Sequence, residues 1–155
     1  MDVVGKANAK GVLKVEPCAS GRDPKPIRDI LAEVVGKGKG AGPEGKVGTA
    51  YYNYGVQMAA LMVEGVRKAF EKAPNGPVSG PWLNEGLRSI TNFTADGMLP
   101  PTTVTKEDHQ GGGQGRIARW DGEKFVPVTD WFTANQDVVW GEVRKYSEEF
   151  KRTGK

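Results

Sequence analysis

The sequence of 155 residues contains one cysteine, Cys18, and one histidine, His109. A single cysteine excludes an internal disulfide framework and any Cys-x-x-Cys metal site. A cysteine–histidine catalytic dyad would need these two distant residues to meet in space. We therefore expect no enzyme activity, no catalytic residue, no metal site and no cofactor.

Long hydrophobic runs are also missing, since hydrophobic residues make up 37% of the chain and the mean hydropathy is -0.51. No run approaches the ~18 apolar residues that a membrane span needs. The first six residues lack the basic-then-apolar pattern of a secretory signal. We expect no membrane insertion and no signal peptide in this chain.

A charge excess of one sign is nearly absent, because 22 Lys and Arg residues face 19 Asp and Glu residues, for a net charge of +3. The basic residues are spread along the chain and mostly alternate with acidic ones. Nucleic-acid binding needs a clustered cationic face, because phosphate contacts supply most of the affinity. We therefore expect no nucleic-acid partner.

Glycine and proline are abundant, at 22 and 10 residues, so loops should occupy much of the chain. The first half nevertheless carries one strand pattern and three helix patterns. A short apolar run before Pro17 predicts a strand, and apolar residues at spacings of three and four predict helices. The predicted elements are a strand over 12–15 and helices over 26–35, 50–72 and, capped by Ser79, up to residue 90.

The second half carries an extended segment over 100–105, a hairpin over 115–128 and a helix over 138–152. Asp121-Gly122 favours a two-residue type I′ turn, which would pair Ile117 with Val126 and Ala118 with Phe125. The last helix is amphipathic, and we expect its apolar residues to face inward: Val139, Val143, Tyr146 and Phe150. The whole pattern predicts a mixed α/β chain.

Two motifs leave a hydrolase open as an alternative. Residues 40–47 match a phosphate-binding loop except at the last position, where Val47 lacks the hydroxyl that would hold Mg²⁺. Glu107, Asp108 and His109 offer metal-ligating side chains, but neighbouring side chains on an extended segment point to opposite faces. A metal- or nucleotide-dependent hydrolase therefore remains the second reading of the sequence.

The order of several segments resembles that in a known family. The segments are Ala9-Lys10-Gly11-Val12, interpreted as an opening strand, then residues 51–57, 97–109, 115–122 and 126–131. Together they resemble the C-terminal portion of the type I periplasmic substrate-binding proteins of branched-chain amino acid (Leu/Ile/Val) ABC transporters. The likeness lies in the ordered set and covers the chain from residue 2 to residue 131.

The resemblance implies an α/β fold of two lobes joined by crossing segments, of which this chain supplies the C-terminal part with segments of both lobes and a β-hairpin. Residues 1–16 would end one lobe, residues 17–105 would form a portion of the other, and residues 106–155 would supply the return crossing, hairpin and C-terminal helix. The implied function is the solute-binding component of an ABC importer, working without catalysis and with an ABC permease as partner. A full-length relative would be periplasmic, and a ligand-sensing regulatory domain of the same fold is the third alternative.

The resemblance also implies three ligand-binding residues, Lys10, Tyr51 and Tyr54. In amino-acid-binding members the position matching Lys10 is commonly acidic and receives the ammonium group of the ligand. The implied solute is an amino acid or a related small carboxylate or amide. A lysine would repel the ammonium of a free amino acid, which favours a carboxylate or a neutral molecule. Because the chain would carry only part of each lobe, we also expect exposed apolar surface and a homodimer formed through it.

Overall fold

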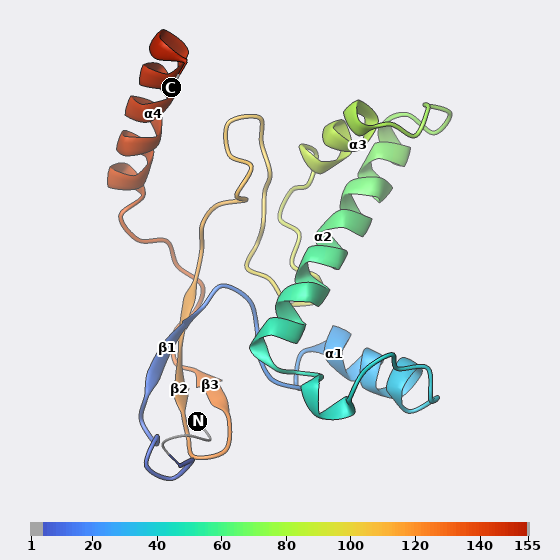
Figure 1. Cartoon of the computed structure of the whole chain (residues 1–155), viewed down its shortest axis with the longest axis vertical. Helices are drawn as coiled ribbons and strands as arrows, with labels where there is room; N and C mark the ends of the chain where they lie inside the picture. Colours follow the sequence, from blue (N-terminus) through green and yellow to red (C-terminus); the bar gives the residue numbers. More distant parts are fainter. Residues whose placement is uncertain (1–4, 155) are drawn as a thin grey trace.

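The structure, a computed structural model, describes residues 5–154 and combines helices with a small antiparallel sheet (Figure 1). The sheet has the order β1 (Leu13–Glu16), β2 (Arg116–Trp120) and β3 (Phe125–Pro127). β1 pairs with β2 antiparallel and places Val15 opposite Ile117, so the sheet joins the start of the chain to its last third. The mixed α/β class is confirmed, and residues 1–4 of the predicted first segment lie outside the described residues.

The predicted hairpin is present, but its predicted register is wrong. Trp120 lies opposite Phe125 and Arg119 lies opposite Val126, so the loop has four residues in place of two. The carboxylate of Asp121 accepts hydrogen bonds from the amides of Glu123 (2.8 Å) and Lys124 (2.9 Å), which stabilises the longer loop. The Trp120 and Phe125 rings then meet edge to face at 5.1 Å, a contact that the predicted pairing would not give.

Helices form the other side of the molecule. They are α1 (Lys25–Ile30), a π-helix (Leu31–Val35), a 3-10 helix (Glu44–Lys46), α2 (Ala50–Lys72) and α3 (Gly80–Leu87). α2 begins where predicted because the Thr49 hydroxyl accepts a hydrogen bond from the Tyr52 amide, and Ser79 caps α3 in the same way through Trp82. Three of the predicted helices are therefore confirmed, with α3 ending earlier than residue 90.

α2 and α3 pack against each other at very short range. A Cβ built on Gly86 would lie 2.1 Å from the carbonyl oxygen of Gly65 and 2.6 Å from the Ala69 side chain. Only glycine therefore permits this approach of the two backbones. Trp82 completes the contact, since its ring meets Phe70 edge to face at 4.8 Å and its indole donates to the Ala73 carbonyl at 3.2 Å.

The main core lies between α1 and the start of α2. Ile27, Val47 and Met98 are buried there, and partly buried apolar residues of both helices surround them. Asn53, also buried, donates to the carbonyl oxygens of Ala19 (2.9 Å) and Gly21 (3.0 Å) and so fixes α2 to the segment that follows β1. Val47 thus packs in the core and does not belong to a phosphate-binding loop.

The last helix, α4 (Gln136–Thr153), extends away from the rest of the chain in Figure 1. No residue of α4 is buried, and the four side chains predicted to face inward are exposed, Val143 by 48% and Phe150 by 63%. The prediction that these four side chains face inward is wrong among the described residues, because no other described element covers the apolar face of α4. Among residues 5–154, no helix combines the length and apolar character of a membrane span.

Candidate functional site

A cleft of about 420 Å³ lies where the sheet meets the beginning of α2. We call it the strand–helix cleft. The sheet side contributes Lys14, Trp120, Glu123, Lys124 and Phe125, with Lys6 beside them; the helical side contributes Ser20, Gly21, Gly48, Thr49 and Ala50. The cleft therefore combines aromatic rings, hydroxyl groups, ammonium groups and one carboxylate from segments that are distant in sequence.

Two contacts hold the walls of the cleft in place. Gly48 has a φ of +88° and its carbonyl accepts from the Gly21 amide at 3.0 Å, so the chain before α2 lies against the chain after β1. A Cβ at Gly48 would lie 3.1 Å from the Gly21 backbone, which explains a glycine at this position. Across the cleft, Lys124 in the hairpin forms an ion pair with Asp23 at 2.6 Å and links the sheet to the helical side.

Glu16 is the centre of the charged network beside the cleft. Its carboxylate accepts from the Ser20 hydroxyl (2.5 Å), the Lys14 ammonium (2.9 Å) and the Arg116 guanidinium (3.0 Å). Burial acts to raise the pKa of Glu16, but these three donors together hold its pKa below the usual value of 4.5. The carboxylate is therefore charged at neutral pH and orients Lys14 toward the cleft wall, where its Nζ lies 4.1 Å from the centre of the Phe125 ring.

A smaller cavity of about 60 Å³ adjoins the cleft and shares Lys14, Ser20 and Ala50 with it. Tyr54 and Cys18 complete its lining, together with Val15 and Glu16. Burial, followed by electrostatic interactions with Cys18, Glu16 and Tyr51, raises the pKa of Tyr54, so its phenol stays protonated at neutral pH. Burial also raises the pKa of Cys18 to about 11, which leaves this thiol a poor nucleophile.

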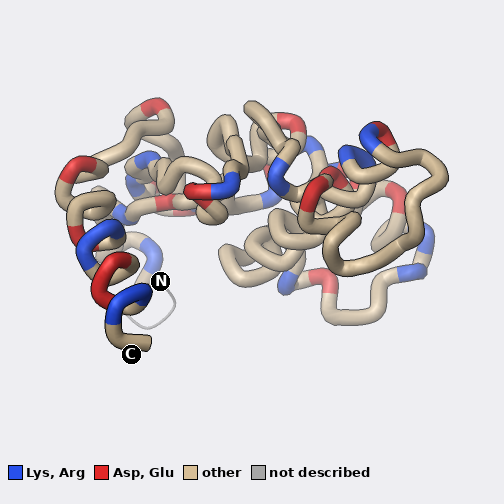
Figure 2. Tube along the Cα trace, turned by 90° about the horizontal axis from the view of Figure 1, so that it is seen from above, with Lys and Arg blue, Asp and Glu red and all other residues tan. Residues whose placement is uncertain are grey.

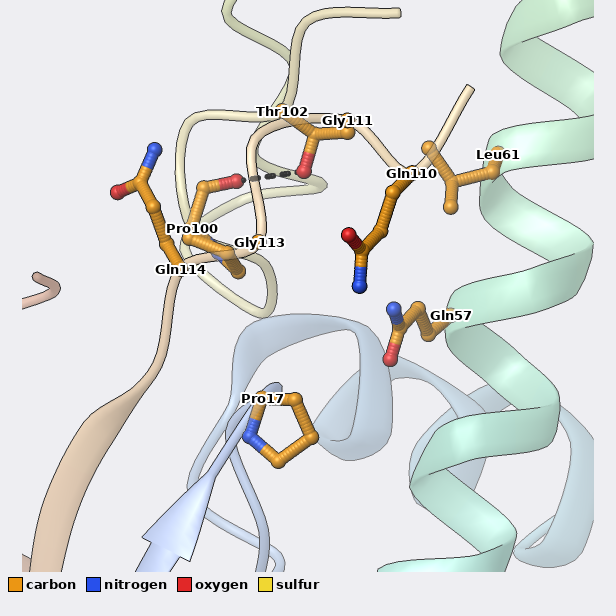
Figure 3. Close-up of a pocket in the computed structure, with 9 residues that line it drawn as sticks. All are labelled: Pro17, Gln57, Leu61, Pro100, Thr102, Gln110, Gly111, Gly113 and Gln114. Carbon is orange, nitrogen blue, oxygen red and sulfur yellow. Dashed lines mark hydrogen bonds between the residues drawn. The ribbon is translucent and has the colours of Figure 1, made fainter. Parts of the chain in front are cut away.

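A separate cavity of about 220 Å³ lies between the middle of α2 and the glycine-rich segment before β2 (Figure 3). The side chains of Gln57 and Gln110 extend toward each other across it, and Pro17 lies below them. Thr102 donates to the carbonyl of Pro100 at 2.9 Å on the far wall. This glutamine cavity has no charged side chain in its lining and lies where the chain passes between the sheet and the helices.

Two solved structures are similar to this fold. One is described as an ABC transporter permease from the Pseudomonas fluorescens group, with a TM-score of 0.82, 26% identity and 94% of this chain covered. The other is a branched chain amino acid ABC transporter from Thermus thermophilus with bound valine, with a TM-score of 0.68, 23% identity and 86% of this chain covered. The chain has the fold of a type I periplasmic binding protein.

The resemblance carried by the sequence is thereby confirmed, together with the predicted fold class. The chain spans 37% of the first structure and 36% of the second. The functions of those whole proteins are therefore only proposed for this chain. No protein-family model matches the sequence, and no curated protein matches it either. The binding-protein fold therefore rests on the two structures.

The three predicted ligand residues of this binding-protein fold lie in different surroundings. Tyr54 lines the small cavity beside the strand–helix cleft. Tyr51 projects from the first turn of α2 and is 88% exposed, without lining the cleft. Lys10 is exposed in a hydrogen-bonded turn before β1, so the prediction that it belongs to the opening strand is wrong. Their roles in ligand binding stay predictions.

Most residues of the cleft could not be identified from the sequence. Local patterns place Lys14 only in a strand, and Trp120 and Phe125 only in a hairpin. Alternation along β1 and β3 would have placed Lys14 and Phe125 on a sheet face. That these side chains meet Ser20 and Thr49 depends on long-range pairing of β1 with β2, which no local pattern specifies.

The residues that suggested a hydrolase do not form a reaction centre. The Asp108 carboxylate accepts from the amides of Gln110 (2.8 Å) and Gly111 (3.1 Å), so it caps its own loop. Within the described range 5–154, no group of three or more His, Cys, Asp or Glu side chains could hold a metal ion. The charges are dispersed as predicted: Figure 2 shows basic and acidic residues spread over the whole trace and alternating along α4.

Proposed function

We propose that this protein supplies part of the solute-binding component of an ABC importer and binds its solute without catalysis. The observation that carries the proposal is the strand–helix cleft, which lies between the two parts of a fold shared with a valine-bound ABC transporter structure. In such proteins the two lobes close on the solute by hinge motion, and the permease recognises the closed form. The full-length protein would then be periplasmic.

The contacts within the chain support the proposed division into lobes. Residues 13–16 pair with residues 116–120, whereas α2 packs on α3 and faces α1 through the core. We therefore place residues 1–16 and 106–155 in one lobe and residues 17–105 in the other. The connections at Pro17 and at residues 105–114 would be the crossing segments between them.

The lining of the cleft favours an amino acid or a related small carboxylate or amide. Lys6 offers an ammonium group and Glu123 a carboxylate. Lys14 is already paired with Glu16 and Ser20. The hydroxyls of Ser20 and Thr49 donate to Glu16 and to the Lys46 carbonyl. The first turn of α2 adds the backbone N–H group of Ala50, because the first amides of a helix lack intrahelical partners, while that of Tyr52 donates to the Thr49 hydroxyl. Trp120 and Phe125 provide apolar surface for the rest of the solute.

An NMR titration of the whole chain with L-valine, small carboxylates and small amides tests this proposal. We expect weak, saturable shifts of Ser20, Thr49 and Phe125, because the described cleft is open on one side. Lys6→Gln should weaken the binding of carboxylates about tenfold, as expected for loss of one charge-assisted contact. Lys39→Gln, at an exposed loop position, is the matched control and should change nothing.

Two outcomes would contradict the proposal. One is an absence of shifts at the cleft with every member of the panel. The other is turnover of a solute, which would indicate an enzyme. Binding that does not change in Lys6→Gln would keep a solute site but reject carboxylates as the ligand class.

A further inference from the structure

A second cavity on the helical side has a different chemical character from the strand–helix cleft. It encloses about 250 Å³ between α2, α3 and the segment that returns toward β2. We call it the Arg88 pocket. Its apolar walls are Leu61, Leu87, Ile90 and Val104, and it shares no lining residue with the strand–helix cleft.

The polar groups of the Arg88 pocket come from three side chains. Arg88 follows α3 directly, Asn84 lies one turn earlier, and His109 comes from the segment before β2. No acidic residue is part of this lining. The pocket therefore presents hydrogen-bond donors and one fixed positive charge within a largely apolar enclosure.

The Arg88 guanidinium is incompletely paired. Its Nε is buried from solvent, and no acceptor for it is found among the described residues. The nearest carboxylate is that of the exposed Glu85, whose Oε1 lies 3.8 Å from Nη1, beyond hydrogen-bond distance. Because Nε is closed to solvent, a ligand in the pocket would accept from the terminal nitrogens of the guanidinium, on a side chain that is 29% exposed and whose one ion pair among the described residues is the long contact to Glu85.

We propose that the Arg88 pocket binds a short aliphatic monocarboxylate. The carboxylate accepts hydrogen bonds from the guanidinium, which matches its planar geometry, and the hydrocarbon part packs on Leu87, Ile90 and Val104. A zwitterionic amino acid fits less well, because no lining carboxylate would receive its ammonium group. The volume also limits the ligand, since drug-sized sites begin at about 300 Å³.

This site does not depend on the proposed transport function. A titration of the 155-residue chain followed by ¹H–¹⁵N NMR tests it, with isovalerate as the probe and isovaleramide as the uncharged analogue of the same shape. We expect saturable shifts of the Leu87, Ile90 and Val104 amides with isovalerate at millimolar concentration. Isovaleramide should bind at least about tenfold more weakly, because it carries no charge for Arg88.

Arg88→Met should abolish the shifts, since methionine keeps an apolar stem and loses the guanidinium. Arg119→Met, at an exposed position of β2, is the matched control and should bind isovalerate normally. Equal binding of the amide, unchanged binding by Arg88→Met, shifts confined to Ser20 and Thr49, or no saturable shift would each overturn the proposal. If Arg88→Met does not fold, the comparison of isovalerate with isovaleramide on the unaltered chain still tests whether the pocket selects a carboxylate.

Discussion

At the scale of single residues, Glu16 shows how a buried charge is tolerated next to a binding cleft. Its side chain is 2% exposed, and three donors from two strands and the following loop surround it. A buried carboxylate with these partners is stable only as an anion. The network therefore fixes both the rim of the cleft and the pairing of β1 with β2.

We expect Glu16→Gln to lower the free energy of unfolding by about 3 kcal/mol at neutral pH, because Lys14 and Arg116 lose their shared anion. The pKa of Glu16 in the folded chain is lower than its usual value of 4.5. Its contribution is thus present above about pH 4.5 and is lost as the pH falls through the lower folded value. Chemical denaturation at neutral and at acidic pH measures both effects.

The matched control is Glu33→Gln, which removes an exposed carboxylate paired with Lys37 on the π-helix. Exposed pairs contribute little, so its stability and its pH dependence should stay close to those of the unaltered chain. Glu16→Gln with the same stability and the same acid sensitivity as the control would show that the network does not stabilise the fold.

At the scale of secondary-structure elements, the packing of α3 on α2 is the clearest case of a glycine that is required. Gly86→Ala should destabilise the protein by about 3 kcal/mol, because its Cβ would overlap the Gly65 carbonyl and Ala69. Gly55→Ala, on α2 where a Cβ meets nothing within 4 Å, should instead stabilise by about 1 kcal/mol. Thermal unfolding of both variants measures the difference, and equal effects would contradict the close approach.

Helix positions were predictable because they depend on local signals. Thr49 and Ser79 are caps that accept from the amide three residues later, and α2 spans Ala50–Lys72 as predicted. Which face of α2 is buried was not predictable. The apolar Val63 is 67% exposed, whereas the polar Asn53 is fully buried and donates two hydrogen bonds to the segment after β1.

At the scale of the whole molecule, the exposed apolar surface of α4 favours association with another surface. No described element covers the stripe formed by Val139, Val143, Tyr146 and Phe150. The prediction of exposed apolar surface is therefore confirmed. Exposed apolar stripes of this kind favour self-association. The homodimer stays a prediction.

We expect sedimentation measurements to show a dimer at high protein concentration and a monomer for Phe150→Glu. The substitution should change the unfolding of the monomer little, because the Phe150 side chain is 63% exposed. Met58→Glu, at an exposed position of α2, is the control and should dimerise normally. A monomeric unaltered chain at high concentration would exclude this mode of association.

The sequence by itself determined the mixed α/β class, the strand near Val15, the helices and the cap at Ser79, because propensity, periodicity and capping act within a few residues. It also carried the resemblance to type I periplasmic binding proteins through the order of its segments. Tertiary structure alone decided the hairpin register, the solvent exposure of α4, and the meeting of Lys14 with Ser20 and Phe125. These features depend on which distant segments pair and on which surfaces find a partner, and pairing over a hundred residues leaves no local pattern in the chain.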